Sequence, residues 1–291
     1  MVVRESGSYL DLVRRVDSLE QIEQLSLVVH RPLSEGRVMG FMICSYADES
    51  ADSRVYSVSG LIGRLRDFVE LERQWRLMLP EKGISEFHAS KLEFAQSPFD
   101  RLDRDQRDDI QRTFIGLITK MPIWGFHGFI ELEAYELHKA ELQRLLPSDQ
   151  SDPYKFTFRL VVEQMAVEVE DYQVKNEPIA FVFDQQQQHQ GKAKEIYDHL
   201  ATAGNWPLAH RLGSLTFASR HCYLCLQAAD AWAYEARKNV SDAYFEKRPE
   251  RWQMTLFKDA GRFNLSGYSK LDLPKMIARA HDDYRARGIT V

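Results

Sequence analysis

The sequence predicts an α/β fold in which a mixed five-stranded sheet is flanked by helices. Two apolar runs of strand length, VMGFMICSY (38–46) and PIAFVFD (178–184), are typical of central strands that are covered on both faces. Between these runs, long stretches carry apolar residues with a period of 3.6, which indicates helices. The 291 residues are 44% hydrophobic and 28% charged, as in ordinary globular proteins.

The first half of the chain contains three expected strands and a helical insert. Residues 1–36 have a polar, helical pattern, and we expect an N-terminal helical extension before a body that spans 37–240. After the first strand, RVYSVSGLIG (54–63) alternates like the second arm of a hairpin. Residues 64–121 have a helical period and form an expected insert between strands 2 and 3. The third strand is IWGFHGFIEL (123–132).

The second half alternates helices with strands. Asp152 followed by Pro153 predicts the start of a long helix, as an N-cap residue and a first-turn proline. The remaining elements are a fourth strand, a helix, a fifth strand and a final helix, over 178–184, about 192–203, 213–219 and 224–238. We expect residues 241–291 to form a C-terminal helical tail. Three leading strands followed by alternating helices and strands are the order of a ribonuclease-H-like sheet.

Composition excludes several classes of protein. The formal charge of −5 excludes a broad basic field, so nucleic acid, which stays one candidate partner, would have to bind at local patches. Three cysteines are too few for a disulfide scaffold, and no apolar run reaches the roughly 18 residues of a membrane span. No P-loop, dinucleotide-binding or nucleophile-elbow motif occurs. We expect a reduced, cytoplasmic protein that does not enter a membrane, and the sequence indicates no oligomeric state.

Acidic residues recur where the expected elements end. Asp48 and Glu49 follow the first strand, Asp184 ends the fourth, and Asp230 lies in the middle of the final helix. Because the carboxyl ends of parallel strands meet at one edge of a sheet, these acids are expected to converge there. Close carboxylates repel one another unless a cation joins them, and Mg²⁺ and Mn²⁺ prefer oxygen ligands. We therefore predict a metal site whose ligands are Asp48, Asp184 and Asp230.

Two points stay open on the residues alone. Acids after strands are also ordinary turn residues, and Asp230 could instead pair with Arg220 or Arg237. Consecutive strand residues point to opposite faces, so Glu49 joins the site only if the chain has already turned. Glu168, on the long helix, is the second candidate for a fourth ligand.

Four short segments carry a resemblance to a known family. YADES (46–50), FVFD (181–184), FASR (217–220) and LQAADAWAY (226–234) resemble the signatures of the domain-of-unknown-function family 3800, over roughly residues 40–240. FHASKL (87–92) is similar to a segment in some of its members. The family's members look like ribonuclease-H-like proteins and are suspected metal-dependent nucleases. The resemblance implies that Asp48, Glu49, Asp184 and Asp230 are the acidic site positions and that Ser50 and Gln227 are their polar neighbours. Ala51 departs from the pattern, which has glycine after the acidic group.

The function expected from these observations is a metal-dependent nuclease that hydrolyses phosphodiester bonds at the carboxylate cluster. Mg²⁺ or Mn²⁺ would stabilise the attacking and leaving oxygens. Glu49 would be a further ligand or the general base. The expected substrate-binding residues are Ser50, His88, Lys91 and Gln227. The alternatives are a non-catalytic binding module of the same fold and a hydrolase of nucleotides or other small phosphates, for which the insert would form a lid.

Overall fold

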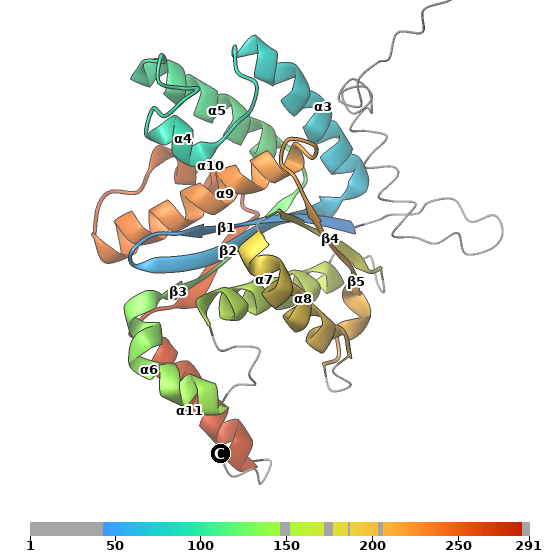
Figure 1. Ribbon diagram of the computed structural model, residues 1–291, viewed down its shortest axis with the longest axis vertical. Helices are drawn as coiled ribbons and strands as arrows, with labels where there is room; N and C mark the ends of the chain where they lie inside the picture. Colours follow the sequence, from blue (N-terminus) through green and yellow to red (C-terminus); the bar gives the residue numbers. More distant parts are fainter. Residues whose placement is uncertain (1–42, 146–151, 172–176, 186, 203–205, 287–291) are drawn as a thin grey trace, which may run out of the picture.

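The computed structural model describes residues 43–145, 152–171, 177–185, 187–202 and 206–286 (Figure 1). The expected N-terminal extension over 1–36 and the beginning of the expected first strand lie outside these residues.

A six-stranded mixed sheet forms the centre of the fold, with the strand order β5-β4-β1-β2-β3-β6. Its strands are β1 (Ile43–Ala51), β2 (Val55–Arg64), β3 (Trp124–Glu131), β4 (Ile179–Asp184), β5 (Leu212–Ala218) and β6 (Phe263–Tyr268). The first three strands form an antiparallel meander, β4 runs parallel to β1, and β5 runs parallel to β4. The predicted α/β class and mixed sheet are confirmed.

The predicted number of five strands is wrong, because β6 extends the sheet beyond β3. This strand comes from the segment that was expected to be a wholly helical tail, and it pairs with β3 in parallel. The ring of Phe263 packs directly on Gly125, where a Cβ atom would lie 2.3 Å from that ring. An edge strand of six residues that is mostly half-exposed has little apolar pattern of its own, so its pairing depends on contact with β3.

Helices cover both faces of the sheet (Figure 1). One face carries α3 (Leu65–Glu81), α4 (Ala89–Glu93), α5 (Arg104–Lys120), α9 (Cys225–Asn239) and α10 (Trp252–Asp259). The other face carries α7 (Pro153–Asp171) and α8 (Gln187–Thr202), while α6 (Leu132–Leu145) and α11 (Leu273–Ala286) pack together beside the β3–β6 edge. The short helices Ala209–Arg211 and Val240–Phe245 precede β5 and follow α9. The expected insert thus forms α3, α4 and α5, on the same face as α9.

Local sequence explains where two of these helices begin. Asp152 accepts a hydrogen bond from the backbone N–H of Lys155 (2.9 Å), which confirms the expected start of α7. Asp103 and Gln106 form a reciprocal capping box at the start of α5. Both helices then bury one apolar face, α7 against β2 and β3 and α5 against α3 and α9.

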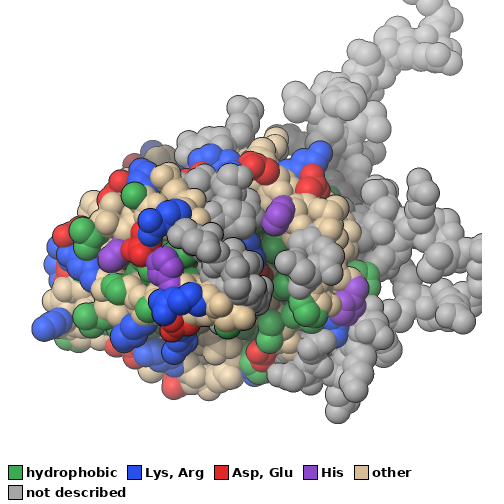
Figure 2. Space-filling model, turned by 90° about the horizontal axis from the view of Figure 1, so that it is seen from below, with side chains coloured by type: hydrophobic (Ala, Val, Ile, Leu, Met, Phe, Trp, Pro, Cys, Tyr) green, Lys and Arg blue, Asp and Glu red, His purple; other side chains and the backbone are tan. Residues whose placement is uncertain are grey.

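The surface carries charges of both signs. On the described part of the face in Figure 2, lysine and arginine side chains are interspersed with aspartate and glutamate. In the described segments, no helix combines the length and the apolar character that crossing a membrane requires.

Candidate functional site

The parallel pairing of β1 with β4 brings Asp48 and Asp184 to the same level of the sheet. Ala47 is paired with Phe183, so each acid is the next residue along its strand. The prediction that Asp48 and Glu49 follow the first strand is wrong, because β1 continues to Ala51 and pairs with β2 throughout. The two acids are therefore strand residues that point to opposite faces. Asp48 faces the α9 side, as do Cys44 and Tyr46.

Helix α9 brings the third acid to this place. Asp230 lies in the part of α9 that crosses β1, and its side chain is buried against the insert. Its Oδ2 accepts a hydrogen bond from the backbone N–H of Ala89 (2.8 Å) and lies 3.4 Å from Nδ1 of His88. The small side chains Ala228, Ala229, Ala231, Ala233 and Ala236 are all buried and allow α9 to pack closely on the sheet.

One guanidinium group contacts all three acids. Arg220 follows β5 by two residues, and its Nε donates to Oδ2 of Asp184 (2.9 Å). Its Nη2 donates to Oδ2 of Asp48 (3.2 Å), and its Nη1 lies 3.3 Å from Oδ1 of Asp230. The three carboxylates therefore each contact the same guanidinium group, which lies between them.

The charges at this cluster do not balance. Three carboxylates against one guanidinium leave a formal excess of two negative charges in a largely buried place. Burial raises the pKa of Asp48 well above its usual range, and Asp230 and Asp184 add to the rise while Arg220 opposes it. Burial also acts to raise the pKa of Asp230, but His88, Arg220 and the Ala89 N–H hold it below its ordinary value. Burial acts to lower the pKa of Arg220, but the three carboxylates raise it above its ordinary value, so the guanidinium stays charged.

Glu49 lies beside the cluster on the other side of the strand. Its Oε1 is 3.7 Å from Nε2 of His189, which is 3.3 Å from the hydroxyl of Tyr56 and stacks on Tyr154. Burial and the nearby Asp184 raise its pKa to about 7. Glu49 still borders the same cleft as the three aspartates, whereas Glu168 is not among the residues that line it.

The expected substrate-binding residues fall into two groups. Ser50 and His88 line the cleft. Gln227 is only 1% exposed: its Oε1 accepts from Nε1 of Trp75 (3.1 Å) and from the Phe87 N–H (2.9 Å), and its Nε2 donates to the Arg220 carbonyl (3.1 Å). The structure thus gives Gln227 a positioning role instead of a substrate contact. Lys91 lies outside the cleft lining, and its Nζ is 3.2 Å from Glu86.

The cleft above the cluster has a volume of about 510 Å³. Its lining consists of Asp48, Glu49, Ser50, Ala51, Asp52, His88, Ser90, Phe94, Arg220, Asp230, Tyr234, Arg237 and Lys238. Sequence reasoning assigned no site role to Ser90, Phe94, Tyr234 or Lys238, and it considered Arg220 and Arg237 as possible partners of Asp230. A signal for Tyr234 and Lys238 was present, since they follow Asp230 at intervals of four residues and so share its helix face. Arg220 follows a strand parallel to β4, so the rule that placed the acids also applied to it.

The three carboxylates are chemically suitable ligands for a hard divalent cation, but their present arrangement around Arg220 does not suit one. All three groups are carboxylates, the ligands that Mg²⁺ and Mn²⁺ prefer. They come from β1, β4 and α9, and they reach a common point. In the described part of the chain, however, no group of three or more histidine, cysteine, aspartate or glutamate side chains is arranged to hold a metal ion. An ion could take these ligands only if the Arg220 guanidinium left the point where they meet.

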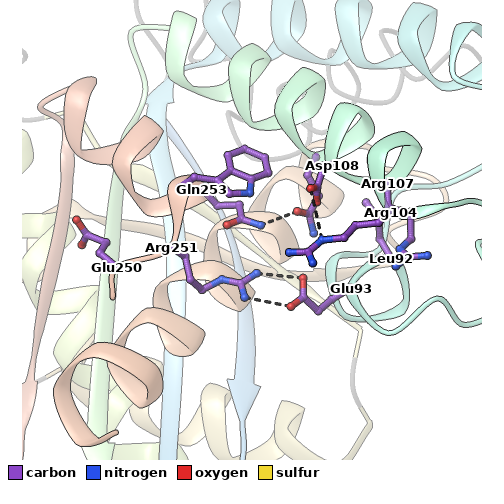
Figure 3. Close-up of a pocket in the computed structure, with 10 residues that line it drawn as sticks. Leu92, Glu93, Arg104, Arg107, Asp108, Glu250, Arg251 and Gln253 are labelled. Atoms are coloured by element: carbon purple, nitrogen blue, oxygen red, sulfur yellow. Dashed lines mark hydrogen bonds and ion pairs between the residues drawn. The ribbon is translucent and has the colours of Figure 1, made fainter. Parts of the chain in front are cut away.

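A second cavity, of about 570 Å³, lies between α4, α5 and α10 (Figure 3). The guanidinium of Arg251 donates two hydrogen bonds to Glu93, each of 3.0 Å, and a third of 3.0 Å to Glu235. Gln253 donates to Gln111 at 2.6 Å. These polar groups pair with one another, so the cavity lining fastens α10 to α4, α5 and α9. The two hydrogen bonds from Arg251 to Glu93 also hold α4 in place, and Ser90 of α4 lines the cleft above the acids.

No known protein-family model matches this chain, and no curated protein shows significant similarity to it. The function therefore has to be argued from the cluster and the cleft themselves.

Proposed function

We propose that the protein is a metal-dependent phosphodiester hydrolase with a ribonuclease-H-like fold, related to the domain-of-unknown-function family 3800. Two features of the architecture support the proposal. The sheet contains the order β3-β2-β1-β4-β5 with β1, β4 and β5 parallel, as a ribonuclease-H-like sheet does. Acids on β1, β4 and the helix after β5 meet at one edge of this sheet, as the sequence resemblance implies.

The excess negative charge at the cluster is the observation that carries the proposal. A single guanidinium offsets only one of three buried carboxylates. Burial raises the pKa of Asp48, and the repulsion by Asp230 and Asp184 adds to the rise. A divalent cation would offset the remainder. Ligation by one or two carboxylates together with water and substrate phosphate is the usual mode for Mg²⁺.

In this proposal Asp48, Asp184 and Asp230 hold the ion. When bound, it would lower the pKa of a water molecule and stabilise charge on the attacking and leaving oxygens. Glu49, at the edge of the cleft, accepts a proton from the attacking water or completes the ligand set. Arg220, displaced from the carboxylates, binds a phosphate oxygen of the substrate, for which its planar guanidinium is well suited.

The position of Arg220 also favours a second candidate function. If the guanidinium stays between the carboxylates, the cluster is a structural ion network and the protein is a non-catalytic binding module. A buried network of this kind can specify a fold without doing chemistry.

Hydrolysis assays distinguish the two functions. We expect the purified full-length chain to cleave single- or double-stranded DNA or RNA oligonucleotides with Mn²⁺ or Mg²⁺ and to lose activity in EDTA. Asp184→Asn should abolish cleavage while the circular dichroism spectrum stays unchanged. Asp109→Asn, at an exposed position on α5, is the matched control and should keep full activity. Absence of cleavage with both metals and all four substrates would refute the hydrolase and favour the binding module.

A further inference from the structure

The acids account for only one half of the cleft. The other half is formed by the C-terminal end of α4 and by the second half of α9. The volume of about 510 Å³ lies within the roughly 300–1,000 Å³ of pockets that enclose a small ligand or one unit of a polymer. The chemistry of this second half therefore bears on which substrate the cluster meets.

Phe94 presents an aromatic ring to solvent at the mouth of the cleft. It is 63% exposed, whereas Phe87 and Phe99 on either side of it in the sequence are buried in the core. Phe94 ends α4, and the next residue, Ala95, has a φ of 49°, so the chain turns sharply there and the ring is kept out of the core. An exposed ring that borders a polar cleft offers a surface on which a flat, apolar group can stack.

Tyr234 places a buried hydroxyl deeper in the same cleft. Its side chain is 4% exposed, and its Oη has no hydrogen-bond partner among the described residues. A buried hydroxyl without a partner destabilises the fold, because it has lost its hydrogen bonds to water. Burial also raises the pKa of Tyr234, so the group stays protonated and can donate. A ligand that supplies an acceptor oxygen would satisfy it.

Positive charge lies along the same side of the cleft. Arg237 lies over the Tyr234 ring at 5.3 Å from its centroid, donates to Ser50 and forms an ion pair with Asp52 at 2.5 Å, and Lys238 follows it on α9. Lys238 is paired with Asp242 at 3.2 Å and lines the cleft, so it can also meet an anionic group there. Together these residues provide an aromatic ring, a buried donor and two cations beside the acid cluster.

We infer that this half of the cleft binds an unpaired nucleotide of a single-stranded nucleic acid, with the base stacked on Phe94 and a sugar or phosphate oxygen accepting from Tyr234. The inference rests on the proposed function and names its substrate. Aromatic side chains beside a cationic groove are the usual means of binding single strands, because every base has a face that can stack. A base in a duplex is already stacked on both faces and would have to leave the helix to lie on Phe94.

The binding of labelled oligonucleotides tests the inference without catalysis. The full-length chain is titrated in EDTA into a fluorescent single-stranded 12-mer and into the same 12-mer made of abasic nucleotides, and fluorescence anisotropy gives each Kd. Phe94→Ala should weaken binding of the normal strand by about tenfold and leave the abasic strand within about twofold. Phe94→Trp keeps an aromatic ring at this position and should therefore bind the normal strand with the affinity of the wild type. Leu137→Ala, at an exposed apolar residue on α6, is the matched control and should leave both Kd values unchanged.

Tyr234→Phe removes the hydroxyl alone. We expect it to weaken both strands by about fivefold, since the acceptor lies on the backbone, while the unfolding midpoint stays the same or rises. A simple loss of structure would lower the midpoint and is thereby distinguished.

Several results would overturn the inference: equal weakening of the normal and abasic strands by Phe94→Ala, no weakening at all, or tighter binding of a duplex. If a mononucleotide competes for binding as well as the 12-mer does, the ligand of this half of the cleft is a small nucleotide and the inference of a polymer is wrong. Metal-dependent cleavage that is insensitive to Phe94 would leave the hydrolase standing and remove the subsite. Binding that depends on Phe94, in a protein that cleaves no substrate, would support the nucleotide subsite and refute the hydrolase.

Discussion

Replacing Arg220 with glutamine removes the cation at which the three carboxylates meet. At an effective dielectric constant of about 20, each contact of the guanidinium at about 3 Å has a gross Coulomb energy of about 5 kcal/mol. Most of this energy is offset by the cost of removing the charges from water. Breaking a buried charge network by deleting one partner nevertheless costs about 3–5 kcal/mol. We expect the free energy of unfolding of Arg220→Gln in EDTA to fall by that amount at pH 7.5.

Urea denaturation followed by circular dichroism measures this loss, and added Mn²⁺ tests its cause. With the guanidinium absent, the carboxylates can accept an ion without competition, so Mn²⁺ should stabilise the variant more than the wild type. A concentration one hundred times the Kd gives about 2.7 kcal/mol. Arg220→Gln combined with Asp184→Asn should lose this response. Arg248→Gln, at an exposed and paired arginine, is the control and should change stability by less than about 1 kcal/mol.

Two results would refute this account of the cluster. If Arg220→Gln is as stable as the wild type in EDTA, the carboxylates do not need its charge. If Mn²⁺ stabilises both proteins equally, the ion binds elsewhere and Arg220 does not compete with it.

Two further predictions concern the support of the site, and a third concerns the docking of β6. Glu235 is buried beside Arg251, and burial raises its pKa from 4.5 to about 7. The contribution of Glu235 to stability is fully present below pH 4.5 and is lost as the pH rises through 7. The free energy of unfolding should therefore fall by about 3 kcal/mol less between pH 4.5 and pH 8 in Glu235→Gln than in the wild type. Urea denaturation at the two pH values measures the difference. Gln227→Leu leaves two buried N–H donors without their acceptor and should cost about 3 kcal/mol; a change in the unfolding midpoint equal to that of a surface variant would contradict its positioning role. Gly267→Ala places a Cβ atom 2.3 Å from the Phe129 ring and should cost about 1–3 kcal/mol, which thermal unfolding would detect as a test of β6 docking. The control Gly116→Ala has open space in α5 and should stabilise the protein by up to about 1 kcal/mol.

Much of the fold follows from local patterns in the chain. The apolar run of β4 and the alternation of β2 predict strands because side chains on a strand alternate between its faces. Asp152 predicts the start of α7 because a side-chain oxygen can satisfy an otherwise unpaired N–H group. The proximity of Asp48 and Asp184 was also predictable, because the parallel neighbouring strands β1 and β4 run to the same edge of the sheet.

Only the tertiary structure decided what lies between those acids. Arg220 and Arg237 are both arginines near Asp230 in the sequence, and the choice between them depends on where β5 ends relative to β4. The pairing of β6 is likewise set by β3, more than 130 residues away, which supplies its hydrogen bonds. Periodicity determines which face of an element is apolar, whereas the partner of a charged group or of an edge strand is set by distances in the folded chain.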